Sequence, residues 1–167
     1  ASYQTFSHFF TRSIWSKSRE IEDKLNTKTL CSPCDGRVLS FGEITDNEMK
    51  GAVKDQNYPF DEFLLGMRRH SGVFTQKLIE DVHKRGNKLM FTIIYLAPGD
   101  YHWFHSPANF KTHFRRHIAG WLDPVKPEYV FKHKNVFKDN ERVNLLGTWD
   151  HGFFGSSFVG AMNVGSI

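Results

Sequence analysis

The most informative stretch of the sequence is Asp100-Tyr101-His102-Trp103-Phe104-His105-Ser106-Pro107. It follows an apolar run of strand length, residues 91–96, and a Pro98-Gly99 turn, so the sequence predicts a strand that ends in a loop carrying two imidazoles. Histidine ordinarily titrates near neutrality, and two histidines at a strand end can therefore divide proton removal and proton donation. The loop is the candidate catalytic segment, although histidines in loops also serve as surface or packing residues.

The spacing of the two histidines constrains the loop. Residues three positions apart point to opposite faces of a regular strand, whereas in a tight 3₁₀-like turn they lie above one another. His102 and His105 can therefore face one site only if the loop turns.

Length and charge set the broad class. With 167 residues and 40% hydrophobic content, the chain is expected to form one domain, residues 1–167. A net charge of +4 and a pI near 9.1 favour an anionic partner, either a phospholipid surface or nucleic acid. No apolar run approaches the roughly 18 residues of a membrane span, and no signal peptide is recognisable. Because the sequence starts at Ala1 and stops after a Gly/Val-rich apolar run, we expect it to be a fragment, incomplete at the C-terminus.

Periodicity gives a coarse order of elements. Helical spacing is found in residues 3–12, 58–65 and 75–85, a solvated helix or linker is expected at 18–28, and a loop at 67–74. Strand patterns cover residues 37–44, 88–96, 141–149 and 153–167. The prediction is an α+β fold, with a mostly antiparallel, barrel-like or sandwiched sheet and with N-terminal and flanking helices.

The N-terminal segment, residues 1–28, combines aromatic and basic side chains. The aromatic residues are Phe6, Phe9, Phe10 and Trp15. Such a stripe can lie in a bilayer interface, or it can pack on its own domain. It is the candidate membrane-docking segment.

Cys31 and Cys34 form a CxxC pattern. A redox pair usually opens a helix, but Pro33 and Asp35-Gly36 indicate a turn here. A zinc site would need histidines from far along the chain, since a second CxxC is missing. Two reduced thiols flanking a turn are expected.

Taken together, the motifs of the sequence resemble those of the phosphatidylserine decarboxylases, which are pyruvoyl-dependent enzymes of phosphatidylethanolamine synthesis. The matching motifs occur in family order and cover almost the whole chain. They are Phe9-Phe10-Thr11-Arg12, Ser32-Pro33-Cys34-Asp35-Gly36-Arg37-Val38, Tyr95-Leu96-Ala97-Pro98-Gly99 with the loop to Pro107, Asn140-Glu141-Arg142-Val143, and Val159-Gly160-Ala161-Met162-Asn163-Val164-Gly165-Ser166-Ile167.

The resemblance implies roles for three residues. In this family a proenzyme cuts itself at the Gly-Ser bond of a Leu-Gly-Ser-Thr motif, and the serine becomes a pyruvoyl group on a small chain. Asp35 would support His105, and His105 would take the proton of the serine hydroxyl. In turnover the pyruvoyl carbonyl serves as electron sink while CO2 departs, and His102 would assist decarboxylation and reprotonation.

One family feature is missing. Leu146-Gly147-Thr148 lacks the serine, and Gly165-Ser166 belongs to a motif upstream of the cleavage site, so the pyruvoyl-forming serine lies outside this sequence. The chain alone is therefore expected to be inactive. Two interpretations follow: a portion of the large chain, or a shortened, non-catalytic decarboxylase-like subunit of a membrane-associated complex.

The resemblance also implies partners. These are phosphatidylserine in a membrane, the small pyruvoyl-bearing chain, and a homodimer or larger membrane complex, with no nucleic acid and no metal. Tyr101, Arg115 and Arg116 are candidate substrate or lipid-binding residues, because guanidinium groups hold oxyanions well. The expected location is the mitochondrial inner membrane, with a bacterial inner membrane as the alternative.

Two other classes compete. A metal-dependent hydrolase would use His102, His105 and Asp100 with His113 or His117, but there is no HExxH motif. A nucleic-acid-binding module would use the basic residues 111–117, which no recognised binding signature accompanies. That stretch is otherwise a solvated strand face.

Overall fold

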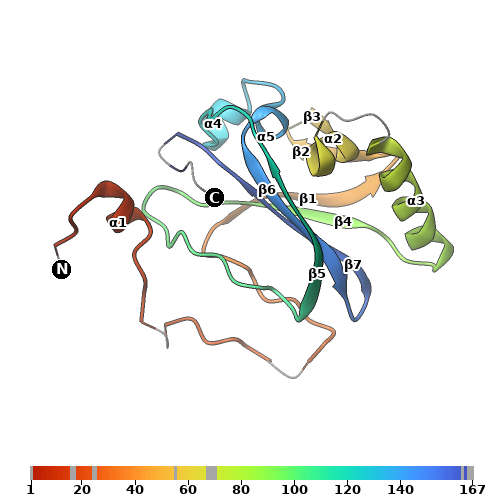
Figure 1. The fold of residues 1–167 in the computed structure, drawn as a ribbon, viewed down its shortest axis with the longest axis horizontal. Coiled ribbons are helices and arrows are strands. Elements are labelled where there is room, and N and C mark those ends of the chain that lie inside the picture. Colours follow the sequence, from red (N-terminus) through yellow and green to blue (C-terminus); the bar gives the residue numbers. More distant parts are fainter. Residues whose placement is uncertain are drawn as a thin grey trace.

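Two antiparallel sheets and several short helices make up the computed structural model, which describes residues 2–15, 18–23, 26–54, 56–66, 71–162 and 164. One sheet has the strand order β3-β2-β1-β4 and the other β5-β6-β7 (Figure 1). The strands are β1 (Arg37–Thr45), β2 (Glu48–Val53), β3 (Gln56–Pro59), β4 (Met90–Tyr95), β5 (Phe110–Ile118), β6 (Arg142–Trp149) and β7 (Gly152–Val159). The helices are α1 (Phe6–Phe10), α2 (Phe60–Leu65), α3 (Ser71–Lys84), α4 (Pro127–Val130) and α5 (Val136–Asp139). The predicted α+β class is confirmed, and the two sheets are compatible with a sandwiched arrangement.

The first sheet is built around β1. Its second half forms a hairpin with β2 through Asp46 and Asn47, both with positive φ (54° and 61°). Asn and Asp tolerate this left-handed conformation better than other residues with a Cβ, which is why they favour two-residue hairpin turns. Most of β1 pairs with β4, the strand that leads into the histidine loop. β2 and β3 were not predicted from the sequence.

The second sheet needs a glycine at its centre. β6 pairs with β5 on one side and with β7 on the other. A Cβ on Gly147 would lie 1.9 Å from the Lys111 carbonyl oxygen of β5. Any side chain at Gly147 would therefore force the strands apart.

One hydrophobic core joins both sheets to the helices. It includes Ile44 and Phe91 from the first sheet, Leu146 from the second, Leu64 from α2 and Ile79 from α3. In Figure 1, α2 and α3 lie at the opposite end of the molecule from α1. The core therefore fixes β1 and β4, and with them the start of the histidine loop.

Arg142, on β6, is a buried cation that holds backbone carbonyls. Its side chain is 1% exposed and donates to the carbonyls of Glu62 (2.8 Å), Phe63 (2.8 Å), Lys138 (2.5 Å) and Asn140 (2.9 Å). At the end of α2, Arg142 supplies a donor to the Phe63 carbonyl and a second donor to the Glu62 carbonyl, which also accepts from the Gly66 N–H (2.9 Å). These hydrogen bonds explain the arginine of the Asn140-Glu141-Arg142-Val143 motif.

Several predicted boundaries changed. The helix predicted at 3–12 is limited to α1, which Thr5 caps by accepting a hydrogen bond from the His8 N–H (3.0 Å). The loop predicted up to residue 74 was wrong from Ser71 onwards, where α3 begins, and residues 67–70 lie outside the described residues. The strand predicted at 153–167 ends at Val159, and residues 165–167 also lie outside the described residues. Crossing a bilayer needs a longer and more apolar helix than any in the described residues.

Arg142→Met should lower the free energy of unfolding by about 2–4 kcal/mol, because buried carbonyls lose their donors. Urea unfolding measures the change. Arg85→Met, at an exposed position just after α3, is the matched control and should stay within about 0.5 kcal/mol of the parent. Equal effects of the two substitutions would contradict the stabilising role of the Arg142 hydrogen bonds.

Candidate active site

The histidine loop begins at a closed turn after β4. The Asp100 N–H donates to the Ala97 carbonyl (2.8 Å), and the Ala97 N–H donates to Asp100 Oδ2 (2.7 Å). Asp100 therefore uses its carboxylate within its own turn.

Two backbone hydrogen bonds bring Asp35 beside His105. The His105 N–H donates to the Pro33 carbonyl (2.7 Å), and the Cys31 N–H donates to the Pro107 carbonyl (3.0 Å). The turn that contains Asp35 thus runs along the second half of the loop. Asp35 and His105 lie close enough for the histidine's charge to influence the carboxylate.

Asp35 is held by a residue that the sequence analysis did not single out as a site residue. Arg19 Nε donates to both Asp35 carboxylate oxygens at 2.8 Å, and Arg19 Nη2 makes a further, shorter contact with Oδ2. These hydrogen bonds lower the pKa of Asp35 from its ordinary value; partial burial opposes them, and the charges of Arg19 and then His105 assist. Asp35 is therefore a carboxylate at neutral pH. Nothing in the sequence signals this pairing beyond a basic residue in a charged stretch.

His105 is exposed and contacts Tyr101. Its Nε2 lies 3.3 Å from the Tyr101 hydroxyl, and the two rings are stacked with centroids 5.9 Å apart. Tyr101, a predicted substrate-binding residue, therefore joins Asp35 and His105 in one cluster, together with Arg19.

His102 has different surroundings. Its Nδ1 lies 2.9 Å from the Asp100 carbonyl, and its ring packs on Phe10 with centroids 3.8 Å apart. Because a carbonyl only accepts, Nδ1 carries the hydrogen, and Nε2 is the basic atom of the neutral ring. The loop thus holds one imidazole against α1 and the other beside Asp35.

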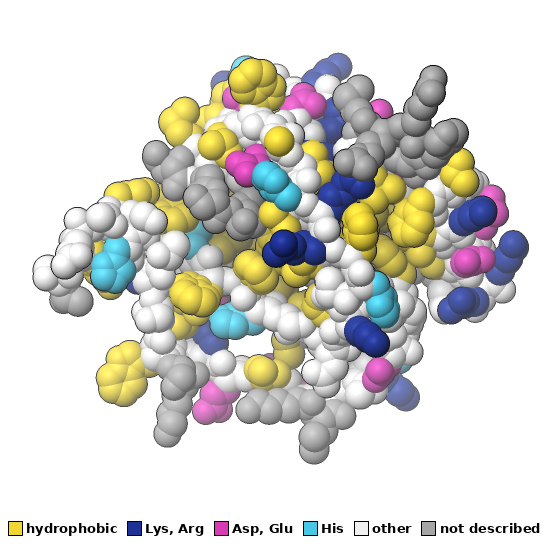
Figure 2. All heavy atoms as spheres, viewed as in Figure 1, with side chains coloured by type: hydrophobic (Ala, Val, Ile, Leu, Met, Phe, Trp, Pro, Cys, Tyr) yellow, Lys and Arg dark blue, Asp and Glu magenta, His cyan; other side chains and the backbone are white. Residues whose placement is uncertain are grey.

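Residues of and after α1 bind the loop directly. Arg12 Nη2 donates to the Gly99 carbonyl (2.8 Å), and Trp103 Nε1 donates to the Thr11 carbonyl (2.9 Å). Phe10 is only 6% exposed, so among the predicted docking residues it is turned toward the loop. Phe6, Phe9 and Trp15 remain exposed at 57%, 39% and 86%. Figure 2 shows hydrophobic side chains on the surface at the left, where Figure 1 places α1 and the segment after it.

The remaining predicted residues lie on β5. Arg115 and Arg116 are paired in regular register with Leu145 and Asn144, so the two side chains leave opposite faces of the strand. They offer two separate cationic contacts, and their lipid-binding role stays a prediction.

The rival site residues have other partners. His113 Nε2 lies 2.8 Å from Thr148 Oγ1, and His117 Nε2 lies 2.7 Å from Glu141 Oε1. Within the described residues, no three His, Cys, Asp or Glu side chains are grouped to hold a metal ion. Cys31 and Cys34 are free thiols, and burial raises the pKa of Cys34.

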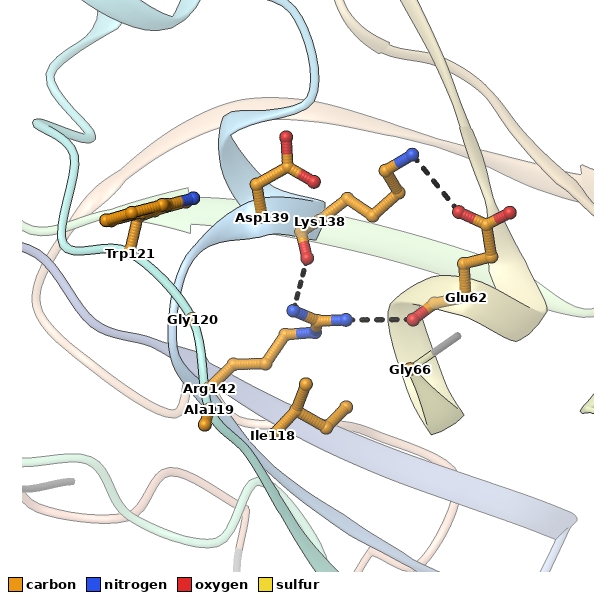
Figure 3. Close-up of a pocket in the computed structure, with 9 residues that line it drawn as sticks. All are labelled: Glu62, Gly66, Ile118, Ala119, Gly120, Trp121, Lys138, Asp139 and Arg142. Carbon is orange, nitrogen blue, oxygen red and sulfur yellow. Dashed lines mark hydrogen bonds and ion pairs between the residues drawn. The ribbon is translucent and has the colours of Figure 1, made fainter. Parts of the chain in front are cut away.

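A cavity of about 300 Å³ lies away from this cluster, between the end of α2, the residues after β5, and α5 (Figure 3). Arg142 forms part of its wall, Trp121 lines it, and the Lys138–Glu62 ion pair (3.1 Å) lies at its edge. None of the predicted catalytic residues lines it. The cavity therefore adjoins the hydrogen bonds of Arg142 and lies apart from Asp35 and His105.

The comparisons with known proteins agree with the motifs. The model of the phosphatidylserine decarboxylase family matches residues 6–167, and the chain belongs to this family. The family predicted from the sequence is thereby confirmed.

Individual relatives align along nearly the whole chain. The mitochondrial phosphatidylserine decarboxylase proenzyme of Rattus norvegicus is 38% identical over 176 residues, covering 99% of this chain and 41% of the relative. The mitochondrial proenzyme of Caenorhabditis elegans is 40% identical, with 99% and 40% covered. The mitochondrial proenzyme 1 of Arabidopsis thaliana is 35% identical, with 99% and 42% covered. The chain spans about two fifths of the length of these curated relatives.

Phe10→Ala should loosen α1 and the loop together, because Phe10 fills the contact with His102. Hydrogen exchange should become faster in both residues 6–12 and residues 99–105. Phe6→Ala removes an aromatic ring that is 57% exposed and should leave the loop unchanged. Faster exchange confined to residues 6–12 in Phe10→Ala would show that the two segments are independent.

Proposed function

We propose that this chain is a large-chain portion of a phosphatidylserine decarboxylase, which converts phosphatidylserine to phosphatidylethanolamine and CO2. Family membership supports the reaction, and one observation carries the site. This is the pair of backbone hydrogen bonds that places the Asp35 turn against His105. A carboxylate beside an imidazole is the arrangement that activates a hydroxyl nucleophile.

The side chains around Asp35 fit a pyruvoyl group, which this family uses and which would come from a serine outside this sequence. A ketone accepts hydrogen bonds, and Tyr101, Arg19 and His105 offer O–H and N–H donors within one cluster. When bound, the group would supply an electron-withdrawing carbonyl that accepts the electron pair left when CO2 departs from the substrate.

Two proton-handling steps fall to different histidines. His105 takes the proton of the serine hydroxyl during self-cleavage, and Asp35 stabilises the resulting imidazolium. His102 holds one proton on Nδ1 against Asp100, so its Nε2 is the atom that holds or delivers a proton during decarboxylation. Tyr101, hydrogen-bonded to His105, limits the ring's rotation.

The substrate places the protein at a membrane. The curated relatives are named mitochondrial, which supports a mitochondrial location, and we propose the inner membrane. The exposed aromatic side chains Phe6, Phe9 and Trp15 provide the docking surface. Arg115 and Arg116 are proposed to contact lipid phosphate or carboxylate. The small pyruvoyl-bearing chain is the proposed partner within one enzyme, and a homodimer or larger membrane complex is the proposed assembly.

Substitutions at the three residues should separate the two steps. In the full-length protein, Asp35→Asn and His105→Ala should slow self-cleavage by about 10²- to 10⁴-fold, the usual contribution of general acid–base catalysis. His102→Ala should still cleave itself but release CO2 from phosphatidylserine at least about 10²-fold more slowly. Gel analysis of the two chains and CO2 release measure the two steps.

His83→Ala, at an exposed position on α3, is the control and should behave as the parent in both assays. Normal self-cleavage of His105→Ala would overturn the assignment of the base. A parent protein that neither cleaves itself nor releases CO2 would overturn the proposed function.

Removing the exposed aromatic side chains should weaken membrane binding. Combined Phe6→Ala and Trp15→Ala should reduce co-sedimentation with anionic phospholipid vesicles by about tenfold or more, since each side chain loses apolar area buried in the interface. Phe41→Ala, which removes a ring that is 75% exposed on β1, is the matched control and should bind normally. Equal losses in the two proteins would indicate nonspecific hydrophobic adsorption.

A further inference from the structure

Arg19 binds Asp35 directly but takes no part in proton handling in the proposed mechanism. It lies in residues 18–23, a described segment without α-helix or strand, and its side chain is 55% exposed. Nevertheless its guanidinium is fixed by several hydrogen bonds. Nη1 donates to the Ser18 carbonyl (2.7 Å), while Nε and Nη2 face the Asp35 carboxylate.

This pair has little value for stability. Exposed ion pairs contribute little to the free energy of unfolding, because water screens the charges and two long side chains lose freedom. The bidentate contact, however, restricts both the position and the plane of the carboxylate. A fold-stabilising role therefore explains the contact poorly, whereas a role in orienting Asp35 explains it well.

The carboxylate can serve Arg19 and His105 at the same time. Its two oxygens offer about four acceptor positions, and the hydrogen bonds from Arg19 leave capacity for an imidazole N–H. The His105 backbone is already tied to Pro33, two residues before Asp35. The orientation of the Asp35 carboxylate relative to the His105 ring thus depends on the Arg19 guanidinium that binds it.

We propose that Arg19 is a positioning residue, which holds the Asp35 carboxylate in a fixed orientation beside His105. This inference deepens the proposed function and rests on it where self-cleavage is concerned. Arg19 acts through Asp35 and His105 and performs no proton transfer itself.

Two substitutions separate charge from geometry. Arg19→Gln removes both the charge and the bidentate contact, and Arg19→Lys keeps the charge but offers an ammonium group without the planar fork. Lys50→Gln breaks another exposed ion pair, Lys50–Asp46 (2.8 Å), in the β1–β2 hairpin, and is the matched control. All three should unfold at nearly the same urea concentration as the parent, because the pairs they break are exposed.

The first readout is the titration of Asp35 in the full-length protein, followed by carbon NMR of labelled aspartate and assigned by difference with Asp35→Asn. Because Arg19 lowers the Asp35 pKa, Arg19→Gln should raise it, and Arg19→Lys should raise it less. An Asp35 titration that is the same in the parent and in Arg19→Gln would overturn the proposal.

The second readout is the rate of self-cleavage at neutral pH, where Asp35 is ionised with or without Arg19. The rate of Arg19→Gln should fall about tenfold through misorientation of the carboxylate. Arg19→Lys keeps the charge without the planar fork and should recover little of the rate, and Lys50→Gln should match the parent. A parent that does not cleave itself would overturn the proposed function, while the NMR titration would still decide whether Arg19 controls Asp35.

Discussion

The placement of α2 and α5 against the second sheet depends on the hydrogen bonds of the buried Arg142 guanidinium. A charge at 1% exposure is tolerated because four backbone carbonyls accept from it. Burial lowers the pKa of Arg142 to about 10, so the side chain remains charged at neutral pH. Asn144, two residues further along β6, adds hydrogen bonds to the carbonyls of Phe63 (3.1 Å) and Leu64 (2.7 Å). The central strand of the second sheet is therefore locked to the end of α2 and to α5.

The histidine loop is connected to β6 through β7. Phe158 on β7 stacks on Phe104 in the loop, with ring centroids 3.8 Å apart. The loop is also tied to the turn before β1 through Pro33 and to the N-terminal segment through Thr11 and Arg12. A segment without regular secondary structure is thus held by contacts on several sides. Such support is what a catalytic loop requires, because small displacements of a proton-transferring group cost much of its effect.

The sequence was most informative where pattern and chemistry coincide. The apolar run before the loop predicted β4, strand-forming residues after the turn at 32–36 predicted β1, and alternation predicted β6, with boundaries that differ little from the structure. β2 and β3 were missed because these short, polar-containing strands depend on pairing with neighbours, β2 with β1 across the Asp46-Asn47 turn and β3 with β2. The proximity of Asp35 to His105 came from family resemblance and not from periodicity. The Arg19 contact could not be predicted, since an ion pair between two irregular segments leaves no local pattern in the sequence.

The two histidines differ because the loop sends them to different neighbours. The His102 ring packs on Phe10, and its Nδ1 is hydrogen-bonded to the Asp100 carbonyl. His105 is exposed beside Tyr101 and Asp35. A residue spacing of three therefore does not stack the rings over one another here. The two histidines therefore respond to different parts of the structure. A displacement of α1 would move His102 directly through Phe10, whereas a displacement of the Asp35 turn would move His105 through the Pro33 carbonyl. If α1 enters a lipid interface as proposed, the membrane contact is one aromatic ring away from the imidazole assigned to decarboxylation.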